Sequence, residues 1–125
     1  MIYLVEDDSS IRELVIYALN STGLEAKGFE KPSEFWKAVE EEEPSLVILD
    51  VMLPEESGID VLKKIRSNPA IEKLPVIMET AKTSEYDRIN GLESGADDYI
   101  SKPFSMMEMV ARVKALIRRT EYKHE

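Results

Sequence analysis

Five short apolar runs alternate along the chain with five stretches of helical periodicity, and this alternation narrows the possible folds more than any other feature. Each run has four to six residues, is rich in Val, Ile, Leu or aromatic side chains, and is bounded by polar or turn residues, as β-strands are. Strict alternation of strands with helices predicts a parallel sheet that is covered by helices on both faces. The predicted strands are Ile2–Val5, Glu25–Phe29, Leu46–Asp50, Pro75–Thr80 and Asp98–Ser101.

The helical stretches repeat apolar residues three, four and seven positions apart, and serines mark most of their expected beginnings. The apolar face of the first helix is expected to consist of Ile11, Leu14, Val15, Ala18 and Leu19. Ser33 is expected to cap the second helix, and the third to fifth helices are expected to begin at Ser57, Ser84 and Ser105, the last in capping-box spacing with Glu108. In the fourth helix the apolar anchors are expected to be Ile89 and Leu92.

The polarity of the runs predicts the order of the strands. Ile2–Val5 and Leu46–Leu49 are apolar throughout or nearly so, as central strands covered on both faces are, whereas Glu25–Phe29 is polar enough for an edge. With right-handed crossovers the order is 2-1-3-4-5, which is a doubly wound, flavodoxin-like (βα)5 sheet of the α/β class. Ligands of such sheets bind beyond the carboxyl ends of the first and third strands.

Composition excludes several kinds of protein. A net charge of -9 disfavours binding of a nucleic-acid backbone by this segment, and the lack of cysteine excludes disulfides, thiolate zinc sites and iron–sulfur clusters. The sequence has no apolar stretch of membrane-spanning length and no signal-peptide pattern, so we expect no membrane association and a cytoplasmic location. We expect one domain, residues 1–119, and a polar tail, 120–125, that begins a linker or ends the chain.

The residues at the carboxyl ends of the predicted strands carry the main functional signal. Glu6, Asp7 and Asp8 follow the first strand, and Asp50 ends the third. Two such charges about 4 Å apart repel by on the order of 4 kcal/mol at an effective dielectric near 20, so they share a proton or hold a cation. Because only oxygen ligands are offered, Mg²⁺ or Mn²⁺ is favoured, and an incomplete carboxylate shell suggests a phosphate ligand.

Asp50 is the best candidate for a nucleophile, since a carboxylate between a metal, a hydroxyl and an ammonium can form an aspartyl phosphate. Thr80 ends the fourth strand and Lys102 follows the fifth, so both are placed to bind phosphoryl oxygens. Each residue has an ordinary structural alternative. In particular, the acidic run after the first strand could simply cap a helix and interact with its dipole.

In their order and spacing, these segments resemble the response-regulator receiver domain of two-component signalling, over nearly the whole chain. The matching segments are Val5–Asp8, Leu49–Pro54 with Gly58, Thr80–Ala81, Gly95–Ile100 and Lys102–Phe104. The resemblance implies a domain that accepts a phosphoryl group from a sensor histidine kinase on Asp50 and catalyses only its own phosphorylation and dephosphorylation, so it is not an enzyme acting on other substrates. It also implies a Mg²⁺ site made of Asp7, Asp50 and the main-chain carbonyl of Met52, with Glu6 acting through a bound water. Thr80 and Tyr99 would form the conformational switch pair, and the Lys102–Pro103 peptide bond would be cis.

The last part of the chain, with Arg118 and Arg119 closing the final helix, resembles the OmpR/PhoB subfamily. This resemblance implies a C-terminal DNA-binding domain, for which 125 residues leave no room, so we expect a truncated chain or a stand-alone receiver. It also implies a homodimer, formed on phosphorylation, through the fourth helix, fifth strand and fifth helix. The pairs expected across that dimer are Arg88 with Glu108, Glu93 with Lys114, Asp98 with Arg112, and Asp97 with Arg119.

Other functions on the same architecture fit less well. A Mg²⁺-dependent phosphohydrolase would need a second acid/base Asp two residues after Asp50, where this chain has Met52. A flavin protein would need a phosphate-binding loop after the first strand, where acidic residues would repel the flavin phosphate. Glu79 departs from the family pattern, which has an apolar residue there. One alternative is that it tunes the coupling of the neighbouring Thr80; the other, which we favour, is that its side chain lies on a partly exposed, helix-facing surface.

Overall fold

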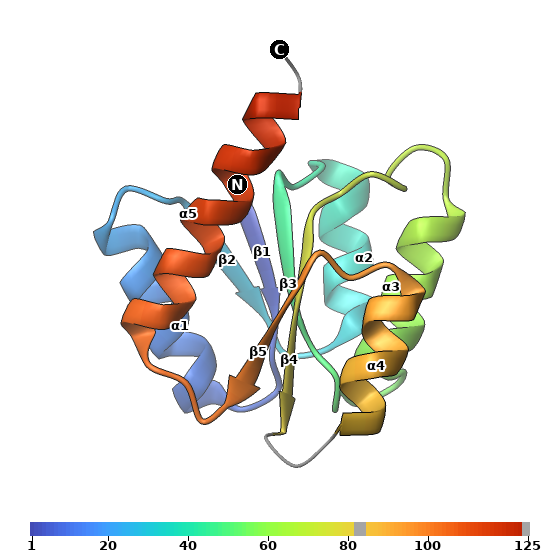
Figure 1. Cartoon of the computed structure of the whole chain (residues 1–125), viewed down its shortest axis with the longest axis horizontal. Helices are drawn as coiled ribbons and strands as arrows, with labels where there is room; N and C mark the ends of the chain where they lie inside the picture. Colours follow the sequence, from blue (N-terminus) through green and yellow to red (C-terminus); the bar gives the residue numbers. More distant parts are fainter. Residues whose placement is uncertain (82–84, 124–125) are drawn as a thin grey trace.

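The computed structural model of the chain describes residues 1–81 and 85–123, except for the side chains of 87, 88, 91, 92 and 121–123. Five strands and five helices alternate along it (Figure 1). The strands are β1 Ile2–Val5, β2 Ala26–Phe29, β3 Leu46–Asp50, β4 Val76–Ala81 and β5 Asp98–Lys102. The helices are α1 Ser9–Ser21, α2 Pro32–Glu41, α3 Gly58–Ser67, α4 Glu85–Ser94 and α5 Met106–Lys123.

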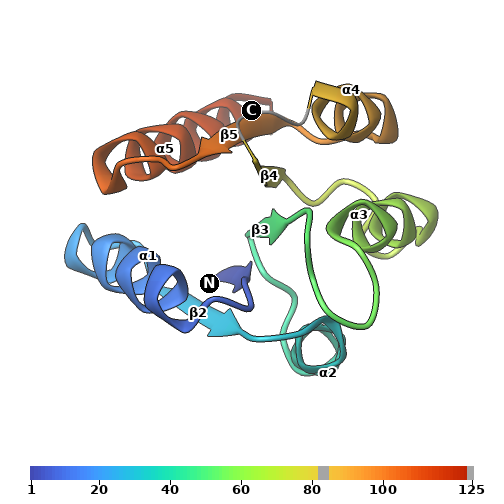
Figure 2. The ribbon, with the colours of Figure 1, turned by 90° about the horizontal axis from the view of Figure 1, so that it is seen from below.

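The strands form one parallel sheet in the order β2-β1-β3-β4-β5, which confirms the predicted topology. Helices α1 and α5 cover one face, and α2, α3 and α4 lie on the other side (Figure 2). Every residue of β1 and β3 is buried, whereas β2 is partly exposed, as their polarity predicts. The predicted second and fifth strands differ from β2 and β5 by one residue at one end, and the predicted fourth differs from β4 by one residue at each end.

Successive residues of the central strands point into two separate apolar layers, as the two-residue period of a strand requires. Val47 and Leu49 belong to the layer under α2 and α3, while Leu46 and Ile48 belong to the layer under α1 and α5. The same alternation continues beyond the apolar part of each strand. It therefore decides which polar residues at the strand ends share a face.

Two of the predicted helix starts are confirmed and one is wrong. The Ser57 hydroxyl accepts from the N–H of Asp60 at the start of α3, and Ser105 does the same for Glu108 before α5. Helix α2 instead begins at Pro32, after a residue that makes no side-chain cap. Proline suits the first helical position because its fixed φ is already helical, so Ser33 lies inside the first turn. The predicted start at Ser84 lies outside the described residues.

Two residues expected on apolar faces are exposed. Helix α1 contacts the sheet through a narrow stripe four residues apart that includes Val15 and Leu19, and Leu14 lies beside it with 55% of its surface exposed. Helix α4 flanks only the edge of the sheet (Figure 2), and Ile89 is 49% exposed. The side chain of the other predicted anchor, Leu92, lies outside the described residues.

All five strands point the same way, with their carboxyl ends at the lower end of the molecule in Figure 1, while α5 runs back and ends at the upper end. Polar residues that follow the strands therefore gather at the lower edge. Within the described part of the chain, no helix is both long and apolar enough to cross a bilayer.

Candidate functional site

An acidic cluster lies at the carboxyl edge of the sheet. Glu6, Asp7 and Asp50 each offer a carboxylate oxygen, and these oxygens lie within 4.8 Å of one another. The pairing of Val5 with Leu49 in adjacent strands brings the first two residues beside the third. The acidic residues at the carboxyl ends of two adjacent strands thus meet at the place predicted from the sequence.

The ammonium of Lys102 lies between two of these carboxylates. Its Nζ donates a hydrogen bond of 2.6 Å to Asp50 Oδ2 and lies 2.8 Å from Glu6 Oε1 in an ion pair without hydrogen-bond alignment. Burial disfavours the charge of Lys102, but the hydrogen bond to Asp50 and the contact with Glu6 outweigh it and raise the pKa of Lys102. Lys102 therefore stays positively charged and neutralises part of the cluster.

Asp50 is the central carboxylate of the site. Burial raises the pKa of Asp50 to about 6, against the lowering effect of the Lys102 hydrogen bond, and Glu6 adds to the rise. Its Oδ1 accepts the N–H of Met52 at 3.0 Å, so each of its oxygens has a donor. The loop after β3 folds tightly over this strand end, because Gly58 packs on the Asp50 carbonyl where a Cβ would overlap it.

The acidic run after β1 has a structural as well as a chemical part. Asp8 caps α1, since its Oδ1 accepts the N–H of Ile11 at 3.1 Å. The N–H of Asp8 in turn donates to Glu6 Oε2 at 3.2 Å. Glu6 is fully buried, whereas Asp7 is exposed. The capping alternative thus holds for Asp8, and the other two carboxylates are left for the cluster.

Thr80 and Tyr99, the predicted switch pair, are both buried. Thr80 is 2% exposed, and its hydroxyl has no hydrogen-bond partner among the described residues. Tyr99 is the Cα partner of Met78 across the adjacent strands, and its ring belongs to the apolar layer on the α3 side of the sheet. A buried hydroxyl without a partner at this edge can donate to a new acceptor.

Glu79 does not lie on a partly exposed surface, so that expectation is wrong. It is fully buried, neither carboxylate oxygen has a hydrogen-bond partner among the described residues, and its Cα pairs with that of Asp50. Burial, with Glu6 as the next contribution, raises the pKa of Glu79 well above its usual value. Glu79 therefore lies next to the three clustered carboxylates as a further buried carboxyl. Its place in an apolar strand beside Asp50 is the signal that could have indicated this.

The charged residues predicted to pair across a dimer are partly paired within one chain. Arg112 donates to Asp98 at 3.0 and 3.2 Å and to Glu108 at 3.1 Å. Asp97 accepts from Arg66 of α3 at 3.0 Å, a partner that the sequence analysis missed.

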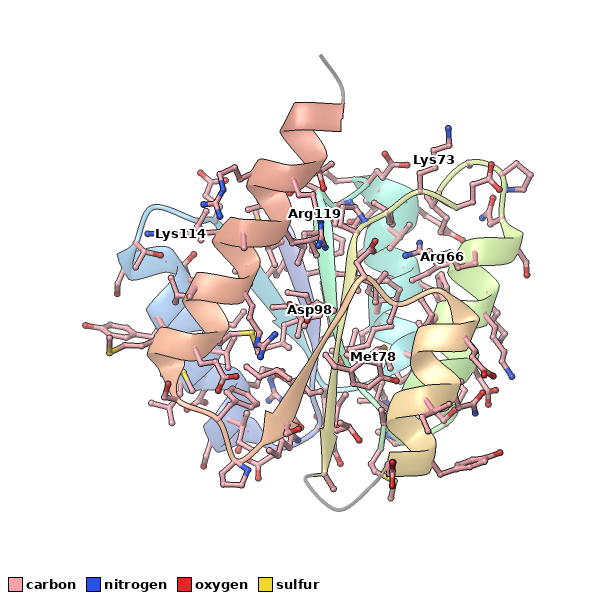
Figure 3. All side chains as sticks on the ribbon, in the orientation of Figure 1. Arg66, Lys73, Met78, Asp98, Lys114 and Arg119 are labelled. Carbon is pink, nitrogen blue, oxygen red and sulfur yellow. The ribbon has the colours of Figure 1, made fainter. Side chains whose placement is uncertain are left out.

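The remaining predicted dimer residues are exposed. They are Glu93, Lys114 and Arg119, while the side chain of Arg88 lies outside the described residues. Figure 3 shows Asp98, Lys114 and Arg119 on the side formed by β5 and α5. In Figure 2, α4, β5 and α5, the elements that carry these residues, lie in a row along one edge of the molecule.

Comparison with known proteins gives one consistent family. The model of the response regulator receiver domain matches residues 2–114. The chain is 48% identical over 121 residues to the transcriptional regulatory protein GltR of Pseudomonas aeruginosa, covering 97% of this chain and 50% of GltR. It is 44% identical over 118 residues to the phosphate regulon transcriptional regulatory protein PhoB of Escherichia coli, covering 94% of this chain and 52% of PhoB.

A solved structure has the same fold. A putative response regulator from Chloroflexus aurantiacus superposes with a TM-score of 0.89 at 32% identity, covering 94% of this chain and 96% of that one. The curated relatives are longer. This chain spans about half the length of GltR and PhoB.

Proposed function

The chain belongs to the response regulator receiver domain family, and on that premise we propose that Asp50 is the side chain that accepts the phosphoryl group. One observation carries the proposal: Asp50 is 4% exposed, lies at the centre of the acidic edge, and is hydrogen-bonded to Lys102 at 2.6 Å. A carboxylate held so rigidly presents one oxygen to an incoming phosphorus. The phosphoryl donor we propose is a sensor histidine kinase.

The donor atoms at this edge fit a magnesium ion. Asp7 and Asp50 supply carboxylate oxygens, the Met52 carbonyl would complete the protein ligands, and Glu6 would act through a bound water. All are hard oxygen donors, and a site with so few of them leaves positions for water and a phosphoryl oxygen. When bound, Mg²⁺, or Mn²⁺ in its place, would neutralise charge that develops on the transferred group.

The remaining residues have roles in the transfer that follow from their contacts. As an Asp50 oxygen forms its bond to phosphorus, the bond from phosphorus to the donor breaks, and the carboxylate loses its own charge. The attraction between Lys102 and Asp50 is then weaker, and Lys102 would move its hydrogen bond to a negatively charged phosphoryl oxygen. The Thr80 hydroxyl, which has no hydrogen-bond partner among the described residues, would supply a second donor. Movement of the Thr80 side chain toward the phosphoryl group would leave space for the Tyr99 ring to turn inward. This would shift the conformational equilibrium of the surface at β5.

The test of this function is phosphorylation by a small phosphodonor such as acetyl phosphate. In millimolar Mg²⁺ the chain is expected to gain one phosphoryl group, stable in acid and labile in base, and calorimetry should show Mg²⁺ uptake. In EDTA the gain should fall below detection, because Lys102 alone neutralises only part of the negative charge of the cluster. If neither Mg²⁺ nor Mn²⁺ bound at millimolar concentration, the proposed function would be wrong.

We extend the proposal to the longer protein. Residues 1–119 would be the receiver and 120–125 the start of a linker, and DNA would be bound by a following domain, as the names of GltR and PhoB as transcriptional regulatory proteins suggest. A stand-alone receiver in a relay is the alternative. A cytoplasmic location stays a prediction. The surface of α4, β5 and α5 would form the homodimer on phosphorylation.

Arg112→Glu is expected to weaken phosphorylation-dependent dimerisation while the phosphorylation rate stays the same. In this chain Arg112 neutralises Asp98 and Glu108, and reversal would place three carboxylates together on the proposed dimer surface. Sedimentation of the phosphorylated protein measures the effect. Arg118→Glu, the same charge change at an exposed position of α5, is the control. Unchanged dimerisation of the Arg112 variant would argue against this surface.

A further inference from the structure

Arg12 of α1 reaches back to the acidic loop and has no role in the function proposed above. Its Nη1 donates a hydrogen bond of 2.7 Å to the main-chain carbonyl of Glu6. This carbonyl immediately precedes Asp7, so the guanidinium fixes the peptide that joins two members of the cluster. A charged donor at this distance makes a strong hydrogen bond.

Gly28 of β2 makes room for this contact. A Cβ at position 28 would lie 2.8 Å from Arg12 Cγ and 3.0 Å from Cδ. No left-handed φ requires a glycine there, and a glycine inside a strand is otherwise unfavourable. Helix α1 lies against β2 (Figure 2), and the stem of Arg12 lies over Gly28, in space that a side chain at position 28 would occupy. The glycine therefore marks a close approach.

Glu6 anchors the loop after β1 through its main chain and through both of its carboxylate oxygens. Its N–H donates to the Phe29 carbonyl at 3.0 Å, its Oε2 accepts from Asp8, and its Oε1 lies 2.8 Å from Lys102 Nζ. Asp7 is exposed, so its place relative to Asp50 is set by the main chain. A movement of the Glu6 carbonyl would move Asp7 with it.

We propose that Arg12 is a positioning residue for the divalent cation site, and that Gly28 is required because it admits the Arg12 side chain. Together they hold the Glu6–Asp7 peptide where the Asp7 carboxylate meets that of Asp50. The inference rests on the proposed function, since it assigns two further residues to the same cation site.

Charge alone predicts the opposite of this proposal. Removal of a positive side chain near an acidic cluster would strengthen the binding of a cation, whereas loss of positioning weakens it. Gly28→Ala changes no charge at all. The direction of the effect and the agreement between two chemically unrelated substitutions therefore distinguish the two mechanisms.

The experiment measures Mg²⁺ binding by calorimetry and the Mg²⁺ dependence of phosphorylation by acetyl phosphate. Arg12→Ala and Gly28→Ala are each expected to raise the Kd for Mg²⁺ about tenfold, the lower end of the effect of residues that orient metal ligands. The rate at saturating Mg²⁺ should change little. Arg12→Lys keeps a donor and should recover part of the affinity. In the Arg12→Ala background, Gly28→Ala should have no further effect.

Thermal unfolding in EDTA tests whether Arg12 and Gly28 have a purely structural role instead. In that case the variants would have a lower melting temperature, but the Mg²⁺ dependence of phosphorylation would be unchanged. If one alanine variant does not fold, Arg12→Lys and the other variant carry the test. Unchanged or tighter Mg²⁺ binding by Arg12→Ala, or additive effects in the double variant, would overturn the inference alone. No Mg²⁺ binding by the unmodified chain would instead overturn the proposed function, and the inference with it.

Discussion

Asp50→Asn is expected to abolish phosphate incorporation from acetyl phosphate in Mg²⁺, with a loss of at least about a hundredfold. The amide lacks the anionic oxygen that attacks phosphorus, and it removes one of the three carboxylates of the cluster. It has the shape of the original side chain and can still accept from Met52, so the fold should persist. Intact-mass measurement after a timed incubation gives the extent of labelling.

Asp60→Asn is the matched control for this variant. Asp60 is exposed in the first turn of α3, close in sequence to Asp50 but outside the acidic cluster. Its labelling rate should equal that of the unmodified chain. Equal labelling of the Asp50 variant, at the same rate and with the same stability in acid, would show that another residue is the acceptor.

Glu79→Leu is expected to stabilise the metal-free fold by about 1–3 kcal/mol, the usual cost of a buried polar group that lacks a partner. Both Glu79 oxygens lack a hydrogen-bond partner among the described residues, and its strand neighbours Ile77 and Met78 are fully buried. An apolar side chain of similar size removes the penalty. Urea unfolding in EDTA measures the gain. Glu79→Gln, which keeps the buried polar atoms, should gain less.

The gain from Glu79→Leu should also grow with pH. The pKa of Glu79 is raised on folding, so its protonated form suits the fold at low pH, and stability is lost as pH rises through the folded-state pKa. The metal-free gain should therefore be larger at pH 7.5 than at pH 5, with each unit of pKa shift worth about 1.4 kcal/mol. A gain that is constant or shrinks with pH would mean that a partner stabilises the ionised carboxylate.

Asp50 adds to the same trend in the unmodified chain. Its pKa rises from 3.8 to about 6 on folding, so metal-free stability should also fall as the pH passes between these values. Comparison of the Glu79 variant with the unmodified chain at each pH cancels this shared contribution. Saturating Mg²⁺ should reverse the trend, since it binds the ionised carboxylates.

The topology and the place of the site could be predicted because each depends on a pattern that is local in the sequence. The apolar residues of the first and third strands and the polar residues of the second predicted the strand order, and the burial of β1 and β3 agrees with it. The parallel sheet then required Glu6, Asp50 and Lys102 to meet at one edge, and they do. The confirmed cis bond before Pro103, in contrast, was implied by the family resemblance alone.

The errors concern contacts that a local pattern does not determine. Leu14 was expected on the buried face of α1, but it is exposed because the stripe of α1 that contacts the sheet is narrower than the apolar face of the helix. The burial of Glu79 depends on the covering of a strand on both faces. The pairing of Asp98 with Arg112 across a dimer, in contrast, stays a prediction; the structure adds that the two side chains also pair within one chain.

The direction of α5 separates the two ends of the molecule. The reactive edge lies at one end, and the 18 residues of α5 extend about 27 Å back toward the other (Figure 1). A domain joined after Lys123 would therefore be attached at the end of the molecule opposite the acidic edge. Because the reactive edge and this attachment point are far apart, the following domain could be replaced by another one without a change in the residues of the reactive edge.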